Sequence, residues 1–488
     1  MHHHANISLK PPSSSNSATL THHHAFLSPN LFPQNPNYVV HPLRKKLRCS
    51  NFNCKGLEIT VPKLRPNSLN NGDDKFRSVT AVKDVDIATL GNLCIDIVLN
   101  VPQLPPKPLD QRKAYMEQLS KSPPDKRYWE AGGNCNVAIA AARLGLHCIT
   151  IGHVGDEIYG RFLIDVLSDE GISIVGMNEQ SEVLNLPSSD YETLLCWVLV
   201  DPLQRHGFCS RADFNVDPAF NWMNKLSTEV KMAIRQSKIL FCNGYDFDEL
   251  SPSLLESAVE CAVESGTSIF FDPGPRGKSL LAGRPEEKRA LGKLLRMSEV
   301  LLLTSEEAVS LTGIDDPILA GQELLKNGAC TKWVIVKMGP KGSILITKSS
   351  ITCAPGFKVN IIDTVGCGDS FVAAIAFGFI HDLPLSYTLT LANAVGAATA
   401  MGCGAGRNVA SLRKVLELLK ESNLNEDDKF WDEVLNDKVN TQDLTVLSKL
   451  VINGNHQVNR VSVQKVVSEL LPKLESAPAK KVAVPSKR

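Results

Sequence analysis

The feature that most constrains the fold of this 488-residue chain is an alternation of strand-like and helix-like segments that begins near Asp84. Short apolar runs predict strands over Val85–Leu90, Cys148–Ile151, Leu194–Val200, Ile239–Cys242, Ser268–Phe271, Val300–Leu303, Trp333–Val336 and Ser343–Ile346. Amphipathic helices are predicted between many of them, such as Tyr159–Glu170, Leu254–Glu264 and Leu319–Lys326. This alternation favours a mostly parallel sheet covered on both faces by helices, with ligands bound beyond the carboxyl ends of the strands.

A glycine-rich segment, Asp363 to Asp369, directly precedes an apolar run from Ser370 to Ile380. Gly366 and Gly368 lack a Cβ, so backbone N–H groups can turn toward an anion, and the start of the following helix adds partial positive charge. Asp369 would face that anion, where a carboxylate can accept the proton of an attacking alcohol. From this segment alone, a helix N-cap is an equally good interpretation of Asp369.

A second glycine-rich segment, Glu130 to Ala138, leads into a helix of small residues earlier in the chain. Its Gly-Gly pair lets a polar ligand approach the backbone, and the amide of Asn136 can both donate to and accept from a hydroxyl. Asp96 follows the first predicted strand and is a candidate acceptor for a hydroxyl group. These residues predict a site for a ligand that carries hydroxyl groups.

With both segments present in this order, the chain resembles the pfkB family of carbohydrate kinases, also called ribokinase-like, over residues 84–419. The resemblance implies a three-layer α/β/α sandwich with a small β lid, and transfer of the γ-phosphate of ATP to an alcohol group of a sugar or sugar-like acceptor. By position it implies a catalytic base at Asp369 and an anion hole at Gly366, Cys367 and Gly368. It also implies a sugar-binding set, which comprises Asp96, Gly132, Gly133 and Asn136.

Further matches imply sites for the nucleotide and for metal ions. Thr304–Glu307 resembles the family's N-x-x-E segment, which assigns Glu307 to Mg²⁺, although Thr304 replaces the usual Asn. Asp363 and Thr364 match positions that help to form a monovalent-cation site in relatives, so the resemblance implies activation by K⁺. The residues expected on the nucleotide side are Lys337, Gly339, Gly342 and Asn393.

Two segments near the expected acceptor site are less regular. Val101–Arg127 is rich in proline and charge and is longer than the family norm. Leu194–Val200 and the following Arg205–Phe208 are expected, by resemblance, to form part of the lid, which would exclude water from the reaction. His206 has two interpretations, a substrate contact or a histidine in a surface loop, and we favour the second.

Composition limits the classes of partner. Lys plus Arg and Asp plus Glu both total 52, so no overall basic field points to nucleic acid. The 13 cysteines are scattered without a CxxC pair, and we interpret them as reduced thiols of the core. No uninterrupted apolar run reaches the roughly 18 residues that a membrane span needs, so no membrane partner is expected.

Residues 1–80 have the composition of a leader. Met1–Gly56 contains no Asp or Glu, is rich in Ser, Asn, Pro and His, and carries a basic cluster at Arg44–Arg48. This is typical of an organelle transit peptide, and the Pro and Ser content favours the plastid. We therefore expect a protein of the chloroplast stroma.

Beyond Leu419 the resemblance ends. Residues 420–474 predict a helical extension, with apolar residues at helical spacing in Leu444–Ile452 and Val461–Leu474, and residues 475–488 predict a disordered tail. The extension either packs on the core, which we favour, or binds a partner such as a second copy or another plastid protein.

Since fold alone does not establish function, two hypotheses stand after the sequence. The first is a sugar kinase that uses ATP and Mg²⁺, and also K⁺; the second is a non-catalytic, kinase-like component of a plastid protein assembly. Asp369, the glycines and Asp96 favour the kinase. Thr304 and Gly274, each in place of a usual Asn, favour the second hypothesis, as does the extension. Within the first hypothesis, a nucleoside in place of a sugar stays open as the acceptor, and the identity of the acceptor does not follow from the sequence.

Overall fold

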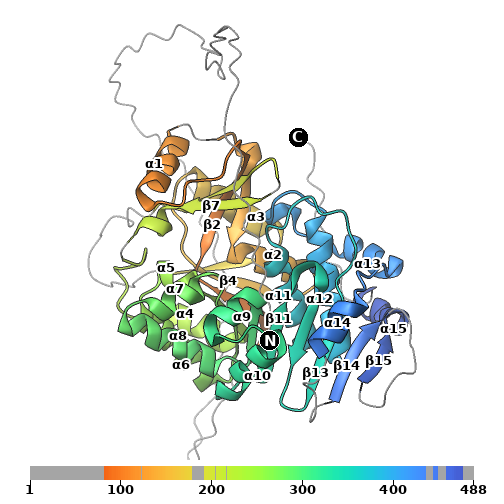
Figure 1. Ribbon diagram of the computed structural model, residues 1–488. Helices are drawn as coiled ribbons and strands as arrows, with labels where there is room; N and C mark the ends of the chain where they lie inside the picture. The colour runs from red at the N-terminus through yellow and green to blue at the C-terminus, as the bar shows by residue number, and fades with distance from the viewer. Residues whose placement is uncertain are drawn as a thin grey trace, which may run out of the picture. The chain divides into compact units, whose positions relative to one another are not determined.

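A large central sheet runs through the part of the chain that the computed structural model describes, residues 82–121, 124–177, 192–203, 205–215, 217–435, 443–448 and 458–475 (Figure 1). Its strands are β1 (Val85–Leu90), β4 (Cys148–Gly152), β5 (Ser173–Gly176), β8 (Ser237–Asn243), β9 (Ser268–Asp272), β10 (Val300–Thr304), β11 (Trp333–Lys337), β12 (Ser343–Ile346), β13 (Ser350–Ala354), β14 (Asp443–Ser448) and β15 (Val458–Ser462). They lie in the order β15-β14-β13-β12-β11-β10-β9-β8-β1-β4-β5. Neighbouring strands are parallel except where β12 pairs with β11 and β13.

Helices cover both faces of this sheet, because the strands carry apolar side chains on both. Along β10, Leu302 belongs to one hydrophobic core, whereas Leu301 and Leu303 belong to the other. The first core is covered by α2 (Asn134–Arg143), α3 (Ile158–Asp169), α11 (Cys367–Ile380), α12 (Leu385–Ala400), α13 (Leu412–Glu421) and α15 (Val463–Glu475). The second is covered by α4 (Thr228–Gln236), α5 (Asp246–Glu249), α6 (Pro252–Ser265), α7 (Arg276–Ala282), α8 (Pro285–Met297), α9 (Ser305–Thr312), α10 (Pro317–Asn327) and α14 (Asp428–Leu435). The predicted three-layer α/β/α sandwich is confirmed.

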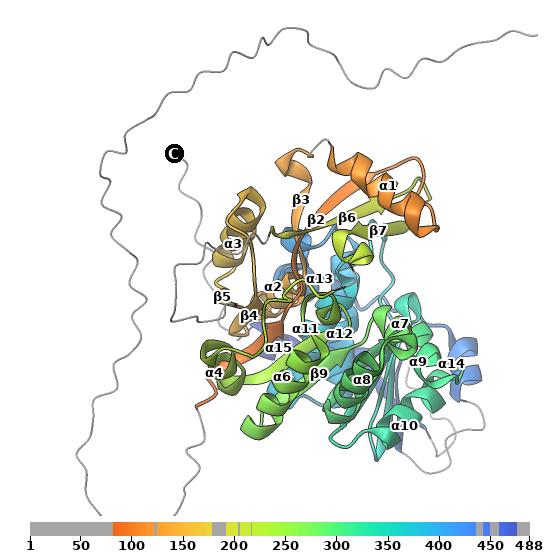
Figure 2. The same cartoon turned by 90° about the vertical axis from the view of Figure 1, so that its left-hand side faces the viewer.

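A second, four-stranded sheet forms the expected lid. Its strands are β3 (Trp129–Gly133), β2 (Leu93–Asn100), β6 (Leu194–Val200) and β7 (His206–Ser210), in that order. Helix α1 (Leu109–Ser120), from the long proline-rich segment, lies beside β7 in both ribbon views (Figures 1 and 2). The lid therefore consists of strands plus one helix from a segment that the sequence alone left unassigned.

The surface-loop interpretation of His206 was wrong. The residue begins β7, its side chain is only 14% exposed, and Nε2 lies 2.7 Å from Oδ1 of Asp363. This contact joins the lid strand to the loop that precedes α11.

The extension beyond Leu419 is only partly helical. Helices α14 and α15 form as predicted, but the described part of the predicted helix over Leu444–Ile452 is strand β14, which pairs in parallel with β13. Leu444 and Val446 face one core while Leu447 faces the other, which is the two-residue period of a strand buried on both faces. Tyr387 donates a hydrogen bond to Glu469, so α15 is tied to α12.

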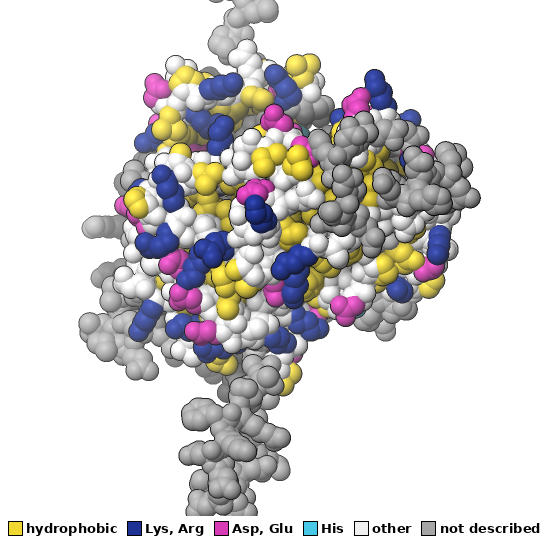
Figure 3. Space-filling view, turned by 60° about the horizontal axis from the view of Figure 1, so that its bottom comes forward, with side chains coloured by type: hydrophobic (Ala, Val, Ile, Leu, Met, Phe, Trp, Pro, Cys, Tyr) yellow, Lys and Arg dark blue, Asp and Glu magenta, His cyan; other side chains and the backbone are white. Residues whose placement is uncertain are grey.

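The expected leader and the expected tail both lie outside the described residues, except for Glu475. Among the described helices, none is long and apolar enough to cross a membrane. On the face shown in Figure 3, side chains of both charge signs are interspersed with apolar ones, in keeping with the balanced composition. Cys94, Cys135 and Cys242 are buried thiols whose pKa burial raises, as expected for core cysteines.

Candidate active site

Two cavities adjoin at the carboxyl ends of the central strands. Asn243, Asp272 and Lys337, the last residues of β8, β9 and β11, line the first, which has a volume of about 780 Å³. The second has a volume of about 450 Å³ and is lined mainly by glycines and apolar side chains. Lys337 and Thr364 line both cavities, so the two spaces meet there.

The start of α11 stands between the two cavities. Gly366 is the N-cap, with φ of +74°, and a Cβ at this position would lie 2.6 Å from the Cβ of Ala405. Only glycine fits such a left-handed, crowded position without strain. Gly366 lines the first cavity, whereas Cys367 and Gly368 line the second. The predicted anion-hole residues therefore lie at the junction of the two spaces.

Asp369 lies in the first turn of α11 and lines the first cavity. The N-cap interpretation is wrong, because Gly366 holds that position, and one oxygen of Asp369 instead accepts a hydrogen bond of 3.1 Å from the amide of Asn136. Burial, followed by the charge of Asp272, raises the pKa of Asp369 to about 6. Such a carboxylate is ionised at neutral pH and still basic enough to accept a proton.

The predicted sugar-binding residues come together, with one difference. Asp96, Gly133 and Asn136 line the first cavity. Gly132 does not line it; a Cβ there would lie 2.3 Å from Cγ of Asp96, so this glycine instead makes room for the Asp96 side chain. Burial, followed by the charge of Asp369, raises the pKa of Asp96 to about 7.

An acidic segment that no sequence motif predicted supports this cavity. Asp246 and Glu249 are buried in α5, directly after β8, and the Glu249 carboxylate accepts a 2.5 Å hydrogen bond from the backbone of Asn92. Burial raises the pKa of Glu249 to about 8 and that of Asp246 well above its usual range. The side chain of Asn243 donates to that of Asn134, which ties β8 to the start of α2. Three acids within four residues after a predicted strand were the available signal.

Lys337 forms a buried ion pair at the junction of the cavities. Its Nζ lies 2.5 Å from Oδ2 of Asp272. Burial alone would lower the pKa of Lys337, but the charges of Asp272 and then Glu307 raise it. The sequence assigned Lys337 to the nucleotide side, and the structure places it on both sides.

Glu307 and Thr304 form a reciprocal capping box at the start of α9. The Glu307 carboxylate accepts from the backbone N–H of Thr304 at 2.7 Å, and the Thr304 hydroxyl accepts from the backbone N–H of Glu307 at 3.2 Å. Burial, then the charge of Asp272, raises the pKa of Glu307. Thr304 thus replaces the usual Asn without loss of the helix cap.

The nucleotide-side glycines and Asn393 line the second cavity. Gly342 has φ of +105°, and a Cβ there would lie 2.0 Å from the carbonyl oxygen of Ala354. The Asn393 amide donates to the carbonyl groups of Ala354 and Pro355, at 3.0 and 3.2 Å, and accepts from Ser343. Asn393 therefore shapes the cavity wall by holding β12 and β13.

The residue predicted for Mg²⁺ and the two predicted for K⁺ lie differently with respect to the cavities. Glu307 lines the first cavity and Thr364 lines both, but Asp363 lines neither. The Asp363 carboxylate accepts from the N–H groups of Val365 and Gly404, at 3.0 and 2.6 Å, and it also faces His206. Asp363 therefore holds the loop that precedes α11 to the segment at Gly404, and activation by K⁺ stays a prediction. Within the described ranges, no group of three or more His, Cys, Asp or Glu side chains is placed to hold a metal ion.

Together, the fold and the two adjoining cavities suit an enzyme that brings two small-molecule ligands together. The family model for pfkB carbohydrate kinases matches residues 85–411, and the chain therefore belongs to the pfkB family of carbohydrate kinases. The enzyme is a phosphotransferase with an alcohol group as acceptor, as the sequence predicted.

Individual relatives agree with this membership. Fructokinase-1 of Oryza sativa subsp. japonica is 26% identical over 60% of this chain and 88% of its own length. The 5-dehydro-2-deoxygluconokinase 1 of Bacillus cereus is 27% identical over 63% of this chain and 87% of its own length. A candidate ribokinase II of E. coli, solved in complex with ATP and Mg²⁺, has a TM-score of 0.53 at 20% identity and covers 69% of this chain and 99% of that one. The last similarity shows the fold.

Proposed function

We propose that this enzyme transfers the γ-phosphate of ATP to a hydroxyl group of a sugar-like acceptor, with Asp369 as the base. The proposal rests on the position of Asp369. In the first turn of α11, Asp369 lines the larger cavity, whereas the neighbouring Gly368 lines the smaller, more apolar cavity. A base placed between two substrates in this way can accept the proton of the attacking hydroxyl.

The other residues have separate tasks in this proposal. Asp96 and Asn136 bind acceptor hydroxyl groups, and Asn136 also orients Asp369 through their 3.1 Å hydrogen bond. The backbone N–H groups at Gly366 to Gly368 stabilise negative charge on the group in transfer. Gly339, Gly342 and Asn393 shape the cavity that takes the nucleotide.

Asp272 and Glu307 line the first cavity close to its junction with the second, and their carboxylate oxygens, the ligand type that Mg²⁺ prefers, would hold this ion. When bound, the ion neutralises charge on the transferring phosphate. Lys337 forms an ion pair with Asp272, and its ammonium group places a positive charge at the junction of the two cavities. The alternative of a non-catalytic assembly component gains no support from this arrangement, in which base, anion site and acceptor residues are all positioned.

The proposal also covers the class of acceptor and the location of the enzyme. Relatives are named for fructose and for a gluconate derivative, so the acceptor is proposed to be a sugar or sugar acid. The composition of residues 1–80, without acidic residues up to Gly56, supports a plastid location.

The test is ADP release by the purified full chain with ATP and Mg²⁺ against a panel of sugars, sugar phosphates, sugar acids and nucleosides. We expect turnover that depends on one class of acceptor. Absence of acceptor-dependent turnover, from protein shown by circular dichroism to be folded, would contradict the kinase proposal and favour the non-catalytic hypothesis.

The rate should depend on pH through the proposed base. Because the pKa of Asp369 is raised to about 6, the fraction of ionised base falls as the pH drops through that value. We therefore expect kcat/KM for the acceptor to fall up to tenfold per pH unit below about pH 6 and to level off above it. The pKa of Asp96 is raised to about 7, in part by the charge of Asp369, so the two carboxylates titrate together. The midpoint of the pH profile therefore describes the pair of Asp96 and Asp369 rather than either residue alone. A flat profile between about pH 5 and 8 would argue against this assignment.

A further inference from the structure

Two arginines line the acceptor cavity that no sequence motif predicted as ligands. Arg112 belongs to α1, in the long segment between β2 and β3, and Arg276 begins α7, after β9. They come from the lid and from the body of the protein, and both line the first cavity but not the second. Their charge is therefore directed at the acceptor side of the junction.

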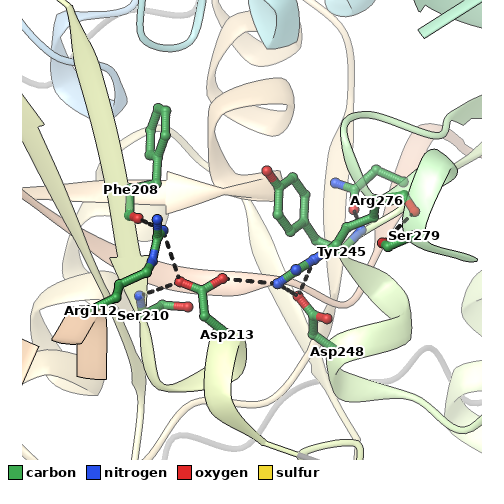
Figure 4. A network of polar contacts seen from close by, with 9 residues as sticks. Arg112, Phe208, Ser210, Asp213, Tyr245, Asp248, Arg276 and Ser279 are labelled. Atoms are coloured by element: carbon green, nitrogen blue, oxygen red, sulfur yellow. Dashed lines mark hydrogen bonds and ion pairs between the residues drawn. The ribbon is translucent and has the colours of Figure 1, made fainter. Parts of the chain in front are cut away.

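The two arginines are close enough for one carboxylate, that of Asp213, to contact both of them. Asp213, in the short helix η2 (Arg211–Phe214), lies between the two guanidinium groups (Figure 4). Its Oδ1 is 3.1 Å from Nη2 of Arg276, and its Oδ2 is 3.5 Å from Nη2 of Arg112. A single anionic group can thus contact both arginines at once, as planar guanidinium groups favour.

The arginines keep hydrogen-bonding capacity beyond these contacts. Arg276 uses Nε and Nη2 toward Asp248 and Asp213, and Arg112 uses Nη2 toward the Phe208 carbonyl and Asp213. A guanidinium group has five N–H donors, and within the described residues the remaining ones have no hydrogen-bond acceptor. The two side chains are 28% and 26% exposed, so these donors are accessible from the cavity.

The charge balance explains why the cavity tolerates this pair before the acceptor binds. Two arginines face two carboxylates, Asp213 and Asp248, so the cluster is near neutral and neither guanidinium is buried without a counter-charge. A neutral sugar needs only hydrogen bonds from this wall, where Ser210 and Ser279 also line the cavity. Two guanidinium groups placed around a single anionic group, as they are around Asp213, are well suited to bind a phosphate or carboxylate group of a ligand.

We propose that the acceptor carries an anionic group, a phosphate or a carboxylate, which Arg112 and Arg276 bind while Asp213 acts as a competing internal carboxylate. This proposal rests on the proposed kinase function and narrows its substrate class. The hydroxyl that receives the phosphate lies at Asp369, and the anionic group lies at the arginine wall of the same cavity. Arg112 and Arg276 are thus specificity residues.

The test compares matched pairs of acceptors in the full-length enzyme: fructose with fructose 6-phosphate, ribose with ribose 5-phosphate, and glucose with gluconate. The first two pairs probe a phosphate, and the third probes a carboxylate. The measured quantity is the ratio of kcat/KM for the anionic member to that for the neutral member. We expect at least one ratio to exceed about ten, since hydrogen bonds to charged groups are among the strong ones.

Three variants separate binding from structure. Arg112→Gln and Arg276→Gln should each lower that ratio about 10- to 100-fold. Asp213→Asn should raise it, because a competing carboxylate is removed; a cluster that merely fastens the lid would give no such gain. Ratios near one in every pair, unchanged in the variants, would overturn the inference and leave the kinase proposal intact.

A binding experiment covers the case in which no acceptor is turned over, the outcome that would overturn the kinase proposal itself. Calorimetry with fructose and fructose 6-phosphate, and with glucose and gluconate, reports affinity without chemistry. Tighter binding of an anionic member, lost in Arg112→Gln, would still support the anion site. Equal or undetectable binding of both members of each pair would overturn it.

Discussion

An Asp369→Asn variant is expected to lose about 10²- to 10⁴-fold in turnover while it folds like the wild type. Asparagine has the same shape, and its side-chain oxygen can still accept the hydrogen bond that Asn136 gives to Asp369. What is lost is the basic oxygen that takes the proton of the acceptor hydroxyl. Initial rates of ADP release, at acceptor concentrations that give both kcat and KM, measure the loss.

Stability should not fall in this variant. Burial raises the pKa of Asp369 to about 6, which means that the fold disfavours the ionised carboxylate present at neutral pH. The neutral amide removes that penalty, so the melting temperature should stay equal or rise. Asp315→Asn, at an exposed acid in the loop before α10, is the matched control and should keep full turnover. A base assignment to Asp369 would not survive if the variant kept more than about a tenth of the wild-type rate.

Several central strands, such as β1 and β12, were predicted from short apolar runs, whereas the equally apolar run of β14 was wrongly predicted as a helix. The bounds of β1 and β12 agree with the prediction, and most of the residues in both strands are apolar and buried. β2 and β3 of the lid were missed, because Asp96 and the Gly132–Gly133 pair interrupt the apolar pattern of these strands. A residue chosen for a ligand rather than for the core weakens the local signal of the strand that carries it.

The candidate site was predictable where glycines and short motifs define it. Gly366 and Gly133 stand at positive φ, a backbone requirement that leaves a mark in the sequence itself. The pairs Lys337 with Asp272 and Arg276 with Asp213 join residues far apart in the chain, and a single sequence holds no record of which residues meet. The role proposed for Arg112 could emerge only once α1 was placed beside β7.

A Lys337→Met variant is expected to lose both stability and activity. The Lys337 side chain is 14% exposed and pairs at 2.5 Å with Asp272, while Glu307 and Asp369 are close enough for their charges to act on it. Removal of the cation leaves three carboxylates together, and loss of one partner of a buried pair costs about 3–5 kcal/mol. Turnover should fall about 10²- to 10³-fold, as for loss of one charge-stabilising donor. Urea unfolding and ADP release measure the two effects.

The double variant Lys337→Met, Asp272→Asn separates the two tasks of this lysine. Replacing both partners removes the uncompensated charge, so most of the lost stability should return. A double-mutant cycle that also includes Asp272→Asn alone gives the interaction energy between Lys337 and Asp272. Turnover should remain low, because the positive charge at the junction of the two cavities is still absent. Recovery of turnover to the level of Asp272→Asn would mean that Lys337 serves only to neutralise Asp272 and does not act on the phosphate. Wild-type stability in Lys337→Met alone would show that the ion pair contributes nothing to the fold.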